Sequence, residues 1–223
     1  MEQSESPCQL GQRKETKQLI PEITAEDLCQ FLTGFSLTPE NYSKIIQRLR
    51  TDRDIVRKKY GLPPLEMLKD NPREFERSLQ EIATGIGVTI LPRIACGSFF
   101  EEILSAKAVF LSSSDTGSEN DKIGVDIKDE TLAELIKSLL ALEHELIHAQ
   151  QHIRYPQMPL EVTEYEAYVA SVNLKALEED PTLIRDAFFD FFVGGSTRTG
   201  YRLLNEDRKR RGLPAVIPDC IKK

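Results

Sequence analysis

The stretch LEHELIHAQQH, residues 142–152, contains an H-E-x-x-H motif and all three histidines of the chain. Residues four positions apart on an α-helix lie one above the other, so His144 and His148 can direct their rings at one ion. Glu145 projects from a neighbouring azimuth, where its carboxylate can bind a metal-held water without binding the metal itself. The spacing therefore predicts a metal site with two histidine ligands.

The motif lies inside a segment whose apolar residues recur at helical spacing. This pattern predicts one long helix over residues 129–153, with Asp129 as its N-cap. Its apolar stripe contains Leu132, Leu135, Ile136, Leu139, Leu142, Leu146 and Ile147. The histidines lie beside the stripe, as expected of a helix that packs one side into a core and lines a cleft with the other. The alternative is polar histidines on an exposed helix face.

A catalytic zinc ion usually takes three protein ligands and keeps a fourth position open, so a third ligand is required. His152 is a poor candidate, because at about 1.5 Å per residue it lies roughly 12 Å along the helix from His144. The next predicted helix, residues 161–178, offers Glu164 and Glu166 near its start. The apolar pattern of this helix does not decide between the two.

HELIH followed by EYEAYVA resembles the gluzincin pattern of zincin metallopeptidases, in which a glutamate on a later helix follows H-E-x-x-H. It is similar in particular to the E-x-E-A segments of HtpX-like and ImmA/IrrE-like peptidases, in which the first glutamate is a ligand. The resemblance covers residues 129–177. The residue after E-x-E-A, an Asp or Asn in those families, is Tyr168 here. The resemblance implies Zn²⁺ bound by His144, His148 and Glu164, with Glu166 as the alternative third ligand.

This ligand set predicts zinc-dependent peptide-bond hydrolysis with Glu145 as general base, because zinc activates water and polarises a carbonyl group. The resemblance further implies a peptide or protein substrate that pairs with the edge of the strand over residues 123–127. Possible donors to the oxyanion are Arg154, Tyr155, Tyr168, Arg198 and Tyr201. Two alternatives are an ImmA/IrrE-like regulator that acts on one protein partner and a non-catalytic, metal-stabilised domain.

The rest of the chain predicts an α+β, zincin-like fold that is mostly helical, with a small three-stranded sheet packed on the long active-site helix. We expect a flexible tail over residues 1–20 and an N-terminal helical region over residues 21–85. The zincin-like metallopeptidase region with its C-terminal helices would cover residues 86–223.

Local signals place the smaller elements of this fold. Runs rich in β-branched residues predict strands at 88–91, 108–112 and 123–127. Helix start signals are Thr24, Thr38 before Pro39, Asn71 before Pro72, and Pro181, and a last helix is expected over residues 199–211. Gly61 and Gly85 are stop signals.

Composition and charge indicate which classes of binding partner and which cellular location to expect. The net charge of −7 argues against nucleic acid, and no stretch is long and apolar enough to span a membrane. A secretory signal pattern is missing from the first residues, so the expected location is cytoplasmic. Four scattered cysteines predict reduced thiols rather than a disulfide framework. None of these patterns predicts an oligomeric state.

Overall fold

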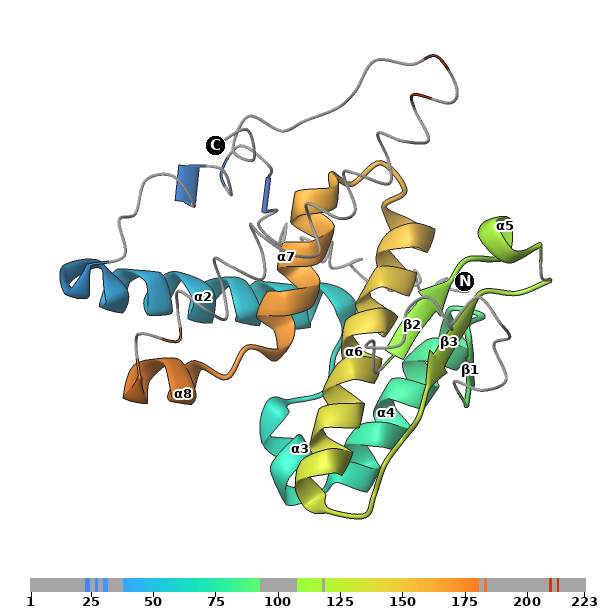
Figure 1. The fold of residues 1–223 in the computed structure, drawn as a ribbon, viewed down its shortest axis with the longest axis horizontal. Helices are drawn as coiled ribbons and strands as arrows, with labels where there is room; N and C mark the ends of the chain where they lie inside the picture. Colours follow the sequence, from blue (N-terminus) through green and yellow to red (C-terminus); the bar gives the residue numbers. More distant parts are fainter. Residues whose placement is uncertain are drawn as a thin grey trace, which may run out of the picture.

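The computed structural model describes residues 38–92, 108–117 and 119–180, together with Ile23, Thr24, Asp27, Gln30, Phe31, Leu183, Lys209 and Gly212. The helices are α2 (Pro39–Tyr60), α3 (Leu65–Asp70), α4 (Pro72–Gly85), α5 (Ser113–Thr116), α6 (Leu132–Arg154), α7 (Leu160–Ser171) and α8 (Leu174–Glu179). The strands are β1 (Thr89–Leu91), β2 (Ala108–Leu111) and β3 (Lys122–Val125). The expected α+β class, mostly helical with a small three-stranded sheet, is confirmed (Figure 1).

Three expectations lie outside the described residues. They are the tail over residues 1–20 and, except for Leu183 and Lys209, the helix expected from Pro181 and the helix expected over residues 199–211. The start signal at Thr24 is described, and its hydroxyl accepts a hydrogen bond from the Asp27 N–H at 3.1 Å.

Helix α6 lies at the centre of the fold, with the sheet and α4 on one side and α7 and α2 on the other (Figure 1). Leu139, Leu142 and Leu146 are fully buried in a core that they share with α4 and the sheet. Ile147 enters a second core, formed mainly by α2, α7 and α8. Because α6 is buried on both sides, its position is fixed by two cores at once.

The N-cap of α6 is Thr131, so the expectation of Asp129 is wrong by two residues. The Thr131 hydroxyl accepts a hydrogen bond from the Glu134 N–H at 3.2 Å. The Asp129 carboxylate accepts a hydrogen bond from the Arg73 guanidinium instead, at 2.6 Å. A threonine three residues before a glutamate is the pattern of a capping box, which explains why the helix begins after Thr131 and not after Asp129.

The sheet order is β1–β3–β2, so β3 is the central strand. It pairs in parallel with β1, where Thr89 faces Lys122, and antiparallel with β2, where Phe110 faces Ile123. The expectation that residues 123–127 offer a free edge is therefore wrong. In the described part of the sheet the edge beside α6 belongs to β2.

Helix α2 ends at the expected residue. Gly61 has a φ of 64°, a left-handed conformation that glycine adopts without steric cost, and it stops α2.

The region after α6 differs from expectation. The prediction of a single helix over residues 161–178 is wrong, because the chain divides into α7 and α8 at Val172 and Asn173. The Asn173 side chain caps α8 by accepting the Ala176 N–H at 3.2 Å. Helix α3 was not expected.

Candidate metal centre

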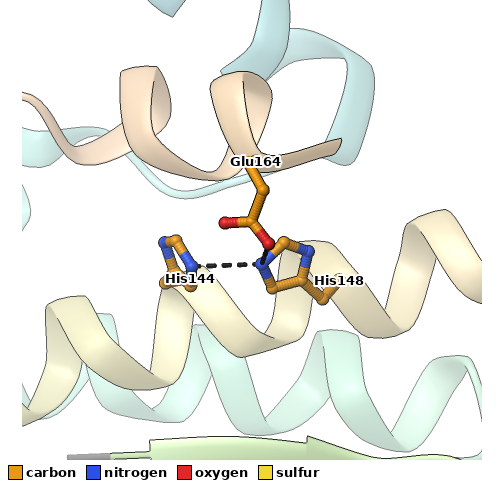
Figure 2. Close-up of side chains that lie close together, drawn as sticks. All are labelled: His144, His148 and Glu164. Atoms are coloured by element: carbon orange, nitrogen blue, oxygen red, sulfur yellow. Dashed lines mark hydrogen bonds and ion pairs between the residues drawn. The ribbon is translucent and has the colours of Figure 1, made fainter. Parts of the chain in front are cut away.

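Helices α6 and α7 bring three potential metal ligands together: His144, His148 and Glu164. One ligand atom from each lies within 4.8 Å of the others. The two Nε2 atoms are 3.1 Å apart, and Glu164 Oε1 is 3.9 Å from His148 Nε2. Figure 2 shows the carboxylate reaching from α7 toward both rings on α6. The short turn over residues 155–159 makes this possible, because it returns the chain against α6.

The spacing of the two rings fits a zinc ion. Two nitrogens bound to one zinc at about 2.05 Å with tetrahedral angles would be about 3.3 Å apart. The observed 3.1 Å is close to this value. Two imidazoles and one carboxylate are also the donor set of many catalytic zinc sites, which leave a fourth position for water. Glu164 Oε1 is 3.9 Å from His148 Nε2, farther than His144 Nε2 is from the same atom, and the Glu164 side chain is partly exposed.

The protonation states of the site suit metal binding. Burial, with a smaller contribution from the charge of His148, lowers the pKa of His144 to about 3, although a backbone hydrogen bond with Ala167 opposes this shift. His144 is therefore neutral at pH 7, and the neutral imidazole is the form that binds a metal. Burial also raises the pKa of the Glu145 carboxyl, against the opposing effects of His148 and the Phe110 N–H. A raised pKa makes this carboxylate a better proton acceptor near neutral pH.

Glu145 lies outside the ligand group and faces strand β2. Its Oε2 accepts a hydrogen bond from the Phe110 N–H at 2.8 Å. Glu145, His148 and Glu164 line one pocket of about 380 Å³, which Phe110 and Tyr155 help to enclose. The pocket therefore holds a separate carboxylate beside the candidate ligands.

Glu166, the alternative third ligand, is directed away from the histidines and is only 1% exposed. Its carboxylate accepts hydrogen bonds from Lys59 Nζ at 2.7 Å, from Gln151 Nε2 at 3.2 Å and from the Tyr60 hydroxyl. The sequence interpretation missed Gln151, although its position three residues after His148 on one helix was a usable signal. No local signal connected Lys59 or Tyr60 with the site.

His152 lines the same pocket without joining the ligand group. It is exposed, with Nε2 3.3 Å from Ser112 Oγ and its ring 5.6 Å from the Phe110 ring. Among the possible oxyanion donors, Tyr155 lines the pocket, whereas Arg154 and Tyr168 do not. Arg198 and Tyr201 lie outside the described residues.

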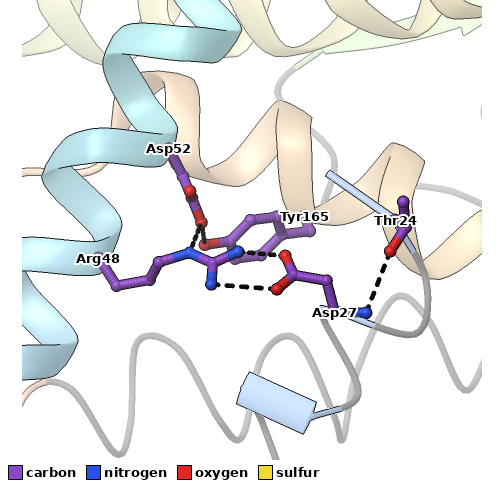
Figure 3. A network of polar contacts seen from close by, with 5 residues as sticks. All are labelled: Thr24, Asp27, Arg48, Asp52 and Tyr165. Carbon is purple, nitrogen blue, oxygen red and sulfur yellow. Dashed lines mark hydrogen bonds and ion pairs between the residues drawn. The ribbon is translucent and has the colours of Figure 1, made fainter. Parts of the chain in front are cut away.

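A larger pocket, of about 730 Å³, borders α2 on another side and contains a polar network (Figure 3). Arg48 pairs with Asp27 and, through Nε at 2.7 Å, with Asp52. The Tyr165 hydroxyl donates to Asp52 at 2.5 Å. This network joins α7 to α2. Of the two pockets, the smaller one is lined by His148, Glu164 and Glu145 and is therefore the candidate site.

Comparison of the chain with protein-family models, with curated proteins and with solved structures finds no match in any of the three. The function is therefore inferred from the residues and geometry of the site. Within the described ranges, no helix has the length and apolar character needed to cross a membrane.

Proposed function

We propose that the chain is a zincin-like, gluzincin-type hydrolase that uses Zn²⁺ to cleave peptide bonds. The ligands would be His144, His148 and Glu164, and Glu145 would be the general base. The observation that carries the proposal is the convergence of two imidazoles and one carboxylate within 4.8 Å, beside a pocket that His148, Glu164 and the separate carboxylate of Glu145 line. Bound zinc would supply a water of lowered pKa and would polarise the substrate carbonyl.

The chain's own groups support proton transfer by Glu145. Burial raises the pKa of its carboxyl, which favours accepting a proton from water and then donating it to the leaving amine. The Phe110 N–H donates a hydrogen bond to one carboxylate oxygen at 2.8 Å, and the Glu145 side chain lines the pocket. Tyr155 lines the same pocket and offers a hydroxyl to the developing oxyanion.

The surroundings of the pocket favour a peptide substrate. Phe110 of strand β2 and Ser112, the residue after the strand, line the pocket. Strand β2 forms the edge of the described sheet beside α6, where the Phe110 N–H is bonded to Glu145. An extended peptide can pair with such an edge through its backbone. Met158 and Leu160 add apolar lining that a substrate side chain could contact.

A purely structural zinc site is less consistent with these residues. Structural zinc is almost always closed by four protein ligands, whereas the group here has three and opens on a pocket. A structural site also has no need of Glu145, which lies beside the group without belonging to it.

The proposal is tested with zinc-loaded protein, a mixed peptide library and the variant Glu145→Gln. We expect cleavage to fall by about 10²–10⁴-fold, because proton transfer is lost, while the bound zinc per chain stays unchanged. Glu130→Gln is the matched control, since this glutamate is exposed and lies ahead of α6. Wild type without bound zinc, or Glu145→Gln with wild-type cleavage, would contradict the proposal. Zinc-loaded wild type that cleaves no library peptide would contradict a general peptidase and favour action on one protein partner.

A further inference from the structure

A chain of hydrogen bonds connects His148 to the last turn of α2. His148 Nδ1 is 3.0 Å from Gln151 Oε1, and Gln151 Nε2 is 3.2 Å from Glu166 Oε2. Lys59 Nζ then donates to Glu166 Oε1 at 2.7 Å, and the Tyr60 hydroxyl donates to Oε2. These hydrogen bonds join three helices, because the residues that form them belong to α6, α7 and α2.

The contacts of Gln151 determine which nitrogen of His148 carries the proton. Gln151 Nε2 faces two acceptors, Glu166 Oε2 at 3.2 Å and the Thr163 carbonyl at 3.1 Å. Its amide oxygen must therefore face His148, and an oxygen can only accept a hydrogen bond. The proton of the neutral ring consequently lies on Nδ1, which leaves the Nε2 lone pair for the metal.

Burial makes this arrangement rigid. Gln151 is 2% exposed and Glu166 is 1% exposed, so both depend on protein partners for their hydrogen bonds. A buried carboxylate requires a counter-charge, and Lys59 supplies it to Glu166. The ammonium group also lies 4.5 Å from the centre of the Tyr155 ring, which lines the pocket.

We propose that Gln151 and Glu166 are positioning residues that hold His148 in the metal-binding tautomer and orientation, with Lys59 and Tyr60 as their anchor on α2. This inference rests on the proposed function, because it assigns His148 to the metal. It makes the end of α2 a part of the metal centre. The N-terminal helical region, expected over residues 21–85, would then contribute directly to metal affinity.

The test compares two buried glutamines in the full chain. Gln151→Met removes the link to His148 and should weaken zinc binding by about 10- to 100-fold, measured by competition with a chelator. Gln150→Met is the matched control, because Gln150 is also fully buried and bonds the backbone carbonyl of Tyr60, whereas the proposed network uses the Tyr60 side-chain hydroxyl. In the Co²⁺-loaded protein, the visible absorption bands should change in Gln151→Met and stay as in wild type in Gln150→Met.

A double variant, Gln151→Glu with Glu166→Gln, distinguishes loss of the hydrogen bond to His148 from a general folding defect. It keeps the net charge and an acceptor for His148 Nδ1 but removes the donor to the Thr163 carbonyl, so it should recover only part of the affinity lost in Gln151→Met. Equal zinc affinities for Gln151→Met and Gln150→Met would overturn this inference alone, and so would failure of the double variant to recover affinity in folded protein. Wild type that binds no zinc would instead overturn the proposed function.

Discussion

Two glutamates that are two positions apart have different surroundings. Glu164 is partly exposed beside the histidines, and Glu166 is buried against Lys59 and Gln151. Side chains two positions apart on a helix are about 200° apart around the helix axis, so they cannot both bind the same ion. The orientation of α7 therefore decides which glutamate can be a ligand.

Replacing each glutamate separately tests this assignment. Glu164→Ala should weaken zinc binding by more than about 100-fold, because losing a ligand costs more than losing a residue that orients one. Glu166→Ala should bind one zinc per chain with an affinity reduced by about 10- to 100-fold. Metal content after gel filtration and chelator competition measure both. The reverse order of effects would show that Glu166 is the ligand.

At the level of elements, Arg57 on α2 joins the two helices that carry the candidate ligands. Its guanidinium binds both carboxylate oxygens of Glu143 on α6, each at 3.0 Å, and the Ala170 carbonyl on α7 at 2.8 Å. Glu143 precedes His144 and is fully buried, so burial raises the pKa of its carboxyl while Arg57 opposes that shift. The pair fixes α6 relative to α7.

The variant Arg57→Met should lower the free energy of unfolding by about 3–5 kcal/mol, because it leaves the Glu143 carboxylate buried without a partner. The double variant Arg57→Met with Glu143→Leu should recover much of this loss, since no unpaired charge remains. Urea unfolding of metal-free protein measures both. Costs that simply add in the double variant would show that the two side chains do not interact.

At the level of the whole molecule, the candidate ligands come from two helices that share one core, and α6 also enters a second core. His144 and His148 lie on α6, which enters both cores, and Glu164 lies on α7, which packs against α2. An ion bound between them would cross-link the helices in the folded state only. Metal binding should therefore stabilise the fold as a unit.

Thermal unfolding with and without chelator tests this link. Zinc at about 100 times its dissociation constant should add about 2.7 kcal/mol to the free energy of unfolding, and chelator should remove this gain. The double variant His144→Ala with His148→Ala should unfold at the same temperature in either condition. An equal response of wild type and the double variant would show that zinc acts elsewhere on the protein.

Features that depend on near neighbours in the chain could be predicted from the sequence. The placement of His144, Glu145 and His148 on one helix follows from helical spacing, and the strand positions follow from runs of β-branched residues. The end of α2 at Gly61 follows from the conformational freedom of glycine. Each of these features depends on a few consecutive residues, so local physical chemistry is sufficient to predict it.

Features that depend on contacts between distant segments were decided by the tertiary structure. The pairing of Thr89 with Lys122 makes β3 central, so the sheet edge beside α6 belongs to β2. The return of α7 onto α6 brings Glu164 to the histidines, and α2 supplies Lys59 to Glu166. Helical spacing places His144 and His148 on one turn of α6, but it carries no information about which helix packs against them. The candidate third ligand and the residues proposed to position His148 depend on that packing.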